Sequence, residues 1–415
     1  MGETRYLIIG GGISGTTAAD TIRQQDAGGE ITIVSGEPYR LYSRIMISKP
    51  HYFLGKVPPE QIWLKKEAWY TDKNIKLIAG KTAVKLEPNA KTVTLNDDTV
   101  LPYDKLLLAV GICARRWSAP GADKKGIHYV RTLEDFQGYQ PASKTAKQGV
   151  VIGGGAIGFE MCELMRLAGL DTTLVIREPH YWDPVLDQTS GRLIEAALER
   201  GGVKIIRGQY VTEAYGGDSV EGLVLQDGRR LPCQMVSVGI GGFCPLDWLK
   251  DSGLKVNRGV VANEYLEASL PDIWTAGDAA EYFDPIYEEQ LQFGSWSNAQ
   301  NQGKVAGSNM AGQKQPYRLV TFYAVSGLGV SIAFIGNVNP PAPDSGKQVV
   351  SRGSFELNNH GRYIIKGSRI VGATLINRTV DVGPLTKLIE QRVDVSGKLQ
   401  ELADPKIDLK TLLPA

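Results

Sequence analysis

The chain has 415 residues, which is long enough for two or three domains that each bury a hydrophobic core. Its formal net charge is +1, from 46 lysines and arginines against 45 acids, which argues against nucleic acid or an acidic membrane surface as a partner. The first residues run directly into an apolar strand, and the sequence has no apolar run long enough to cross a bilayer. We therefore expect a cytoplasmic protein that does not bind a membrane.

The cysteine pattern bounds the chemistry further. The four cysteines are scattered, with no C-x-x-C pair and no spacing typical of metal ligands. The sequence therefore predicts no metal ion and no iron–sulfur centre in the protein itself.

The first element is a glycine loop between a strand and a helix. Apolar residues 6–9 lead into Gly10-x-Gly12-x-x-Gly15, followed by a helix-forming stretch. Gly10 permits a tight turn, Gly12 leaves room for a pyrophosphate, and Gly15 lets the helix pack closely on the strand. A second strand at residues 31–34 leads to Glu37, which is placed to accept a hydrogen bond from a ribose hydroxyl. We expect a dinucleotide site here, with Ser14 also in contact.

The same pattern recurs in residues 150–160. Gly153, Gly155 and Gly158 repeat the spacing, again after an apolar strand and before a helix. Two dinucleotide sites in one chain imply two nucleotides, and we interpret them as a bound FAD and a diffusing NAD(P)H. The NAD(P)H contacts are expected at Gly153, Gly155, Ile157, Gly158, Arg177 and Gly241.

The stretch after Glu37 resembles a known family. Tyr42, Arg44, Ser48 and Lys49 match a Tyr-x-Arg-x-x-Leu-Ser-Lys pattern, with Ile47 in place of the leucine. This pattern is similar to that of FAD-dependent pyridine nucleotide oxidoreductases, in the branch of ferredoxin and rubredoxin reductases and the flavin module of nitrite reductase. The resemblance implies that Arg44 neutralises the FAD pyrophosphate and that Lys49 lies near flavin N5. An exposed basic loop is the alternative.

The same stretch excludes thiol chemistry. Disulfide reductases of this superfamily carry two cysteines here, and the peroxidase and oxidase branch carries one. This chain has Tyr42 and Ser43 instead, and no cysteine in residues 1–112. Electrons must therefore leave the flavin to an acceptor that docks or diffuses in.

Three later stretches resemble the family's remaining FAD contacts. Residues 103–111 match the strand that closes the first half of the FAD domain. The resemblance implies that the nearby Arg115 contacts FAD, and the alternative is an arginine in the linker between domains. Residues 270–278 resemble the second FAD signature, where Gly277 and Asp278 follow a strand and Asp278 opens a helix. Residues 296–306 match a Trp-x-x-Ala-x-x-Gln-Gly run, which implies a helix pointing its N-terminus at the flavin. The residues implied there are Trp296 and Ala299, with core packing as the alternative for Trp296.

The nucleotide domain contains one expected catalytic residue. The helix at residues 159–168 carries Glu160, which the resemblance places at the nicotinamide, with a buried structural carboxylate as the alternative. Arg177 follows the strand at residues 172–176 and suits a 2′-phosphate, whereas the adjacent Glu178 would repel one. We expect NAD(P)H, with a slight preference for NADPH, and a surface arginine is the alternative for Arg177. A helix at residues 188–199 and a hairpin at 222–231 complete the domain.

The C-terminal part is rich in expected strands, at residues 320–323, 329–334, 349–357, 362–366 and 370–376, before a helix at 382–391. It resembles the family's interface domain. Tyr323 begins the stretch that replaces a Trp-Ser-Asp sequence of oxygenase-linked ferredoxin reductases.

Together these patterns predict an α/β protein with two interleaved Rossmann-like domains and a C-terminal α/β interface domain. The expected bounds are 1–114 with 243–313 for FAD, 115–242 for NAD(P)H, and 314–415 for the interface domain, through which the chain is expected to form a homodimer. The expected function is hydride transfer from NAD(P)H to FAD, with Lys49 and Glu160 as catalytic residues. Electrons then pass to a small iron–sulfur carrier of the ferredoxin or rubredoxin type. An NAD(P)H oxidase using O₂ and a flavin-bearing subunit of a fixed redox complex are the alternatives.

Overall fold

The computed structural model describes residues 4–340 and 345–414. Contacts divide the chain into two units. The first comprises Met1–Ser43, Glu60–Cys113 and Phe243–Thr321, and the second comprises Arg44–Pro59, Ala114–Gly242 and Phe322–Ala415. Each sequence-predicted dinucleotide loop lies in a different unit. In the described residues no helix combines the length and the apolar character needed to cross a bilayer.

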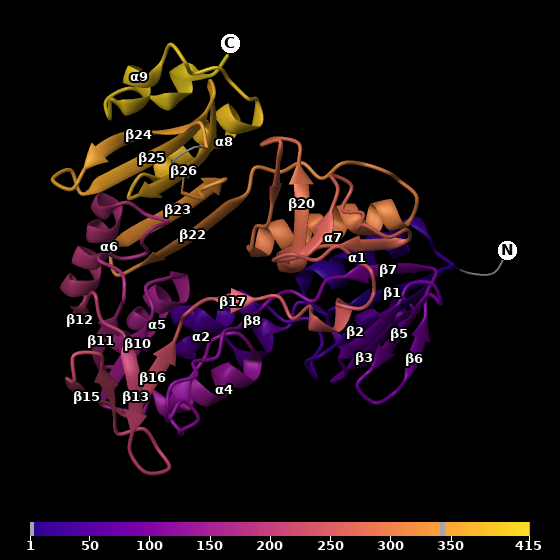
Figure 1. Cartoon of the computed structure of the whole chain (residues 1–415), viewed down its shortest axis with the longest axis horizontal. Helices are drawn as coiled ribbons and strands as arrows, with labels where there is room; N and C mark the ends of the chain where they lie inside the picture. The colour runs from indigo at the N-terminus through magenta and orange to yellow at the C-terminus, as the bar shows by residue number, and fades with distance from the viewer. Residues whose placement is uncertain (1–3, 341–344, 415) are drawn as a thin grey trace. The chain divides into compact units, whose positions relative to one another are not determined.

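The first unit is built on a parallel five-stranded sheet in the order β19-β7-β1-β2-β3 (Figure 1). Its strands are β1 (Arg5–Ile9), β2 (Glu30–Ser35), β3 (Ile75–Ala79), β7 (Lys105–Leu108) and β19 (Ile273–Thr275). Helices α1 (Ile13–Gln25) and α7 (Trp296–Met310) pack closely against each other. A Cβ added at Gly303 would lie 2.2 Å from the Ser14 carbonyl oxygen, so a side chain there would separate the two helices.

Smaller elements complete the first unit. Residues 92–102 form a hairpin within a three-stranded sheet of β4 (Ala83–Glu87), β5 (Thr92–Leu95) and β6 (Val100–Pro102). A second three-stranded sheet contains β18 (Val260–Ala262), β20 (Ala280–Asp284) and β21 (Glu289–Leu291). The short helices are α3 (Glu67–Asp72), η2 (Pro59–Ile62), η3 (Asp247–Leu249) and η4 (Gly277–Ala279).

The end of β20 contains a buried acid, Asp284. Its carboxylate accepts hydrogen bonds from the Tyr282 hydroxyl, at 3.1 Å, and from the Ile286 backbone, at 2.8 Å. Burial raises the pKa of Asp284 from 3.8 to about 6, because these hydrogen bonds offset only part of the cost of desolvating a charge.

The pKa of Asp284 predicts a pH effect on stability. Because its folded pKa is raised, this group favours the folded state below pH 3.8 and loses that contribution as the pH rises through about 6. We expect wild type to lose about 1 kcal/mol relative to Asp284→Asn between pH 5 and pH 7, as measured by urea unfolding. Parallel stability profiles for the two proteins would contradict this assignment.

The second unit contains another parallel five-stranded sheet, in the order β12-β11-β10-β16-β9 (Figure 1). Its strands are β9 (Ile127–His128), β10 (Gln148–Ile152), β11 (Asp171–Val175), β12 (Val203–Ile206) and β16 (Met235–Val238). Its helices are α4 (Leu133–Ala142), α5 (Ala156–Leu167) and α6 (Gln188–Arg200). The expected hairpin is present in a sheet of β13 (Val211–Tyr215), β14 (Gly222–Leu225) and β15 (Arg230–Pro232). Strands β8 (Cys113–Ala114) and β17 (Gly242–Phe243) pair where the chain passes from one unit to the other.

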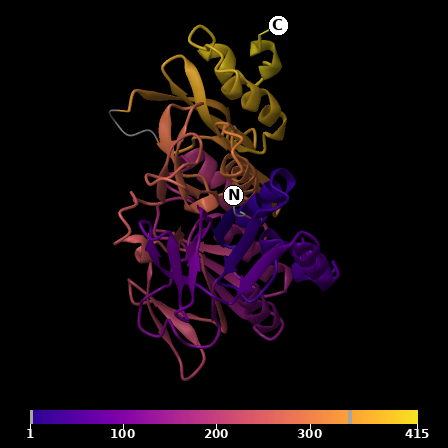
Figure 2. The same cartoon turned by 90° about the vertical axis from the view of Figure 1, so that its right-hand side faces the viewer.

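The C-terminal region of the second unit is an antiparallel sheet in the order β22-β23-β26-β25-β24. Its strands are β22 (Phe322–Gly327), β23 (Val330–Gly336), β24 (Lys347–Ser354), β25 (Asn359–Lys366) and β26 (Arg369–Ile376). The strand expected at residues 320–323 begins two residues later and is longer. It continues to the turn at Leu328 and Gly329, where both φ angles are positive. Helices α8 (Val382–Glu390) and α9 (Leu399–Ala403), with η5 (Thr379–Asp381) and η6 (Leu409–Leu412), pack beside this sheet (Figures 1 and 2).

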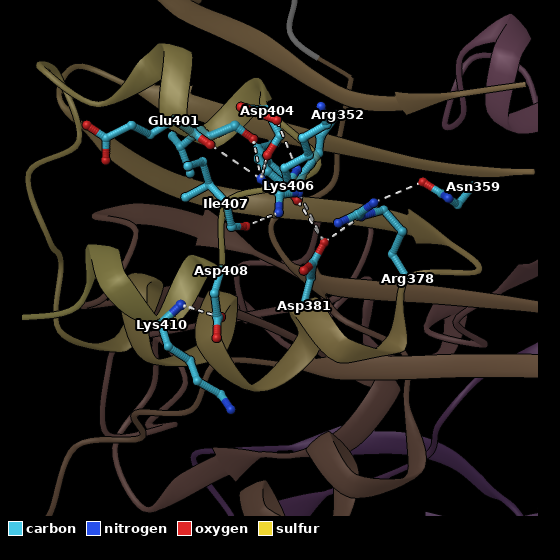
Figure 3. A network of polar contacts seen from close by, with 12 residues as sticks. Arg352, Asn359, Arg378, Asp381, Glu401, Asp404, Lys406, Ile407, Asp408 and Lys410 are labelled. Atoms are coloured by element: carbon cyan, nitrogen blue, oxygen red, sulfur yellow. Dashed lines mark hydrogen bonds and ion pairs between the residues drawn. The ribbon is translucent and has the colours of Figure 1, made fainter. Parts of the chain in front are cut away.

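A buried arginine on β24 holds the C-terminal segment (Figure 3). The Arg352 side chain is 2% exposed, and its guanidinium donates to backbone carbonyls of Glu401, Leu402, Asp404 and Ile407. Its Nε lies 3.5 Å from the Asp381 carboxylate. Because each carbonyl replaces water that the cation lost on burial, Arg352 fixes the last turns of the chain on the sheet.

Candidate functional site

The first glycine loop forms a cradle at the end of β1. Gly10 has a φ of 127°, and a Cβ there would lie 2.0 Å from the Ala109 carbonyl oxygen. A Cβ at Gly15 would lie 2.0 Å from the Gly10 carbonyl oxygen, so both positions require glycine for packing. A Cβ at Gly12 would meet no atom within 4 Å. Gly12 is also the N-cap of α1 and offers no side chain to its backbone N–H groups, so the space beside it suits a phosphate.

The second loop repeats this geometry in the other unit. Gly153 has a φ of 109°, and its added Cβ would lie 2.3 Å from the Gly239 carbonyl oxygen. An added Cβ at Gly158 would lie 2.0 Å from the Gly153 carbonyl oxygen, whereas one at Gly155 would meet no atom within 4 Å. Gly155 is the uncapped N-cap of α5. The chain therefore builds the same anion-binding cradle twice.

Ser14, Gly277 and Ala299 are brought together in the first unit. An added Cβ at Gly277 would lie 3.2 Å from the Ser14 Cβ and 3.5 Å from the Ala299 Cβ. The Ser14 hydroxyl is buried and has no hydrogen-bond partner among the described residues. A buried hydroxyl without a partner is costly, so its position beside the cradle fits a polar ligand such as the FAD phosphates.

Asp278 differs from expectation in its local structure. The strand β19 precedes it as expected, but the residue lies in the three-residue 3-10 turn η4 and opens no α-helix. The helix was wrong because β20 begins directly afterwards, at Ala280. The Asp278 carbonyl accepts a hydrogen bond from Gln292 Nε2 at 2.8 Å. The FAD contact of the Asp278 carboxylate stays a prediction, and no helix N-terminus lies beside it.

Glu37 lies just beyond β2 and has a tyrosine partner. The Tyr42 hydroxyl donates to its Oε2 at 2.6 Å, and the Tyr42 side chain is buried. Tyr42 also packs edge-on against Trp63, with ring centroids 6.3 Å apart. The carboxylate expected at the ribose is therefore held by a fixed phenol.

The two expected catalytic residues form one ion pair within the second unit. Lys49 is the N-cap of α2 (Pro50–Phe53), and its Nζ donates to the Glu160 carboxylate on α5. The Glu160 side chain is 7% exposed, whereas that of Lys49 is 42% exposed. Burial and the Glu160 charge raise the pKa of Tyr323 on β22 well above its usual range, so this phenol stays protonated. The buried carboxylate thus has a cation on one side and a neutral phenol near it.

This ion pair gives a testable stability effect. Lys49→Met leaves the Glu160 carboxylate buried without its cation, which costs free energy that water reaching the half-exposed lysine position offsets only in part. We expect a loss of about 1–3 kcal/mol in unfolding free energy by urea titration. The double variant Lys49→Met/Glu160→Gln should recover most of that loss. Additive effects of the two substitutions would contradict the pairing.

The three expected arginine contacts have other partners in this structure. Arg44, in η1 (Arg44–Ser48), donates to the Arg131 backbone carbonyl. Arg115 has an exposed side chain, and its backbone N–H donates to the Gly241 carbonyl at 2.9 Å. Arg177 is 80% exposed, and its Nε donates to Glu178 at 2.7 Å. Their nucleotide contacts stay predictions.

The remaining expected contacts lie at loop and helix ends. Gly241 has a φ of 95° and open space at its Cβ position, and Ile157 is half-buried in the first turn of α5. Trp296 is half-buried at the first position of α7, where the Ser295 hydroxyl caps the helix by accepting from the Asn298 N–H. The flavin contact of Trp296 stays a prediction.

Two supporting residues were missed at the sequence level. Gln302 Oε1 accepts from the Gly277 N–H at 2.7 Å, which ties α7 to the turn before Asp278. The Tyr181 hydroxyl donates to the Gly155 carbonyl at 2.7 Å and so supports the second loop. Gln302 stands in the recognised Gln-Gly pair, which could have indicated it. Tyr181 has no such signal, because its partner is a backbone atom distant in sequence.

Two glycine cradles on two parallel sheets define the class of protein: an oxidoreductase that binds two dinucleotides. Residues 4–303 match the model of the pyridine nucleotide-disulphide oxidoreductase family, and residues 341–413 match the reductase C-terminal family. The chain therefore belongs to the pyridine nucleotide-disulphide oxidoreductase family, which confirms the resemblance and the α/β fold class. It is an oxidoreductase with FAD as its cofactor and NAD(P)H as its nucleotide substrate.

Individual relatives support this assignment. The chain is 30% identical to a nitrite reductase [NAD(P)H] of Bacillus subtilis over 95% of its own length, and it spans about half (48%) of that relative. It is also 30% identical to the ferredoxin–NAD(+) reductase component of the biphenyl dioxygenase system of Paraburkholderia xenovorans, over 98% of both chains. The crystal structure of a covalent putidaredoxin reductase–putidaredoxin complex matches with a TM-score of 0.91 and 25% identity, over 99% of this chain and 98% of that one.

Proposed function

We propose that the protein transfers reducing equivalents from NAD(P)H through FAD to a small iron–sulfur carrier of the ferredoxin or rubredoxin type. The observation that carries this proposal is the duplicated cradle, because an open N-cap glycine in each unit offers separate sites for two dinucleotides. Relatives named as ferredoxin–NAD(+) and rubredoxin–NAD(+) reductases support the choice of acceptor.

The residues present fit both nucleotides. Gly10, Gly12 and Gly15 would hold the FAD pyrophosphate, with the Ser14 hydroxyl, Glu37 and Asp278 at its hydroxyls and phosphates. Bound FAD would accept hydride from NAD(P)H and release the electrons singly to the carrier. By the family resemblance, Lys49 would supply a positive charge to the flavin, and Glu160 holds that lysine in place.

The two buried thiols are poorly placed to take part. No cysteine occurs before Cys113 in the sequence. Burial raises the pKa of Cys233 to about 12 and that of Cys162 further, so both buried thiols stay protonated. This supports direct transfer from the flavin to an external acceptor.

The experiment is anaerobic reduction of the purified flavoprotein with NADH and with NADPH in turn, followed by ferredoxin, rubredoxin or O₂. We expect rapid loss of flavin absorbance with a nucleotide and reoxidation by an iron–sulfur carrier faster than by air-level O₂. Reoxidation by O₂ at the carrier's rate would assign the protein as an NAD(P)H oxidase instead.

Nucleotide preference is a separate prediction at Arg177 and Glu178. Arg177 is tied to Glu178 by the 2.7 Å hydrogen bond, so Glu178 competes with a 2′-phosphate for this guanidinium. We expect Glu178→Gln to shift the kcat/KM ratio of NADPH to NADH upward about tenfold. An unchanged ratio would remove both residues from the 2′ site.

A flavin-bearing module of a larger redox enzyme is the second candidate. The B. subtilis nitrite reductase favours it, because this chain spans only about half of that relative. Stoichiometric co-purification with an iron–sulfur protein would support this alternative.

We also propose that residues 314–415 form a separate interface domain, that the chain forms a homodimer through this domain, and that the protein is cytoplasmic. Sedimentation velocity of the full chain tests the homodimer.

A further inference from the structure

Two buried polar atoms of the first unit have no hydrogen-bond partner among the described residues. They are the Ser14 hydroxyl oxygen, in the first turn of α1, and the side-chain Nε2 of Gln302, on α7. Ser14 is 5% exposed and Gln302 is 0% exposed, so bulk water does not satisfy either group. A buried polar group without a partner costs free energy, and in a folded protein it indicates that a partner binds there.

Both atoms belong to side chains that meet at one backbone turn. Gln302 Oε1 accepts from the Gly277 N–H at 2.7 Å. A Cβ added at Gly277 would lie 3.4 Å from the Ser14 hydroxyl oxygen, and one added at Gly303 would lie 2.2 Å from the Ser14 carbonyl oxygen. Ser14 therefore contacts both the Gly277 turn and the residue that follows Gln302, where α1 packs against α7 (Figure 1).

The direction of the Gln302 amide is fixed by the Gly277 N–H. Exchanging the amide oxygen and nitrogen would place one donor against another, so Oε1 is the atom that faces Gly277. Nε2 remains as a buried donor, and it does not bond the Ser14 hydroxyl, because neither atom has a partner. A third group that accepts hydrogen bonds would satisfy both of them.

We propose that Gln302 Nε2 and the Ser14 hydroxyl donate to the same phosphate group of FAD. The inference rests on the proposed function, because it takes FAD as the group that the first glycine loop binds. Ser14 lies between Gly12 and Gly15 of that loop, so its hydroxyl is beside the helix N-terminus that suits a phosphate. An anionic oxygen has several lone pairs and accepts more strongly than a neutral one. Gln302 thus extends the phosphate site from α1 to α7.

The test is the FAD affinity of Gln302→Glu at two pH values, measured by fluorescence titration of the full-length apoprotein. The introduced carboxyl keeps an oxygen for the Gly277 N–H and replaces the N–H₂ donor with a second oxygen. At pH 8 the carboxylate repels a phosphate, so we expect the Kd for FAD to rise at least about tenfold. At pH 5 a buried carboxyl beside an anion is protonated and can donate, so we expect the rise to narrow to about threefold or less.

Two further variants control for charge and for folding. Gln300→Glu places the same charge at an exposed glutamine of α7, and its Kd for FAD should stay within about twofold of wild type at both pH values. Ser14→Ala removes only a hydroxyl without a partner, so the apoprotein should melt no lower than wild type. Its Kd for FAD should nevertheless rise about fivefold.

The outcomes separate this inference from the proposed function. An unchanged Kd for FAD in Gln302→Glu at pH 8 would show that Nε2 bonds only buried water. A loss of affinity that persists at pH 5, or that Gln300→Glu shares, would reject the phosphate contact as well. Unchanged affinity in Ser14→Ala would overturn the shared site even if Gln302→Glu does not fold. Wild type that binds no FAD would contradict the proposed function itself.

Discussion

Gly12→Val is expected to give a folded protein that no longer retains FAD. The added Cβ lies in open space in this structure, and the Gly12 φ of −74° suits any residue, so we expect the variant to fold. The valine side chain would occupy the space that the FAD pyrophosphate needs beside the α1 N-terminus. We expect FAD affinity to fall about 100-fold or more, which corresponds to roughly 2.7 kcal/mol, measured by flavin content and fluorescence titration.

Gly15→Val is the contrasting variant. Its Cβ would lie 2.0 Å from the Gly10 carbonyl, so it should disturb the packing of α1 on the sheet and lower the melting temperature of the whole chain. Gly12→Val, by comparison, should keep the circular dichroism spectrum of apo wild type. A yellow Gly12→Val protein with normal FAD affinity would show that this loop does not hold the cofactor.

Gly155→Val should impair NAD(P)H binding while leaving FAD binding intact. An added Cβ there meets no atom within 4 Å, and the φ of −104° is unstrained, so the variant should fold and keep its FAD. NAD(P)H would lose its pyrophosphate position at the α5 N-terminus. We expect kcat/KM for NAD(P)H with ferricyanide to fall about 100-fold or more, measured by steady-state kinetics.

Chemical reduction provides the control for Gly155→Val. Dithionite reduces flavin without a nucleotide site, so it should bleach the variant and wild type to the same extent. If Gly155→Val lost its FAD, or kept wild-type reduction by NAD(P)H, the assignment of one nucleotide to each loop would fail.

The sequence predicted these loops well because their geometry is local. Gly10 and Gly153 need positive φ angles, and Gly15 and Gly158 each need close approach to the carbonyl five residues earlier, so spacing alone carries the information. Strand β1 and helix α5 were predictable for the same reason. Family membership was predictable from the longer patterns at residues 42–49 and 296–306.

Contacts between distant segments could not be predicted. The Lys49–Glu160 pair joins residues 111 positions apart, and neither stretch contains a sequence pattern that indicates contact with the other. The buried Arg352 bonds carbonyls, which any residue provides, so its role was invisible in the sequence. The helix expected at Asp278 failed because strand pairing of β20 with β18 begins at Ala280 and overrides the local signal.

The most direct test of the central claim is an anaerobic reductive titration of the purified protein, followed at the flavin absorbance. We predict one FAD for each chain and complete bleaching after two electrons, supplied equally well by NAD(P)H or by dithionite. Uptake of four electrons would reveal a redox-active thiol pair, and a colourless protein that FAD cannot reconstitute would contradict the whole account.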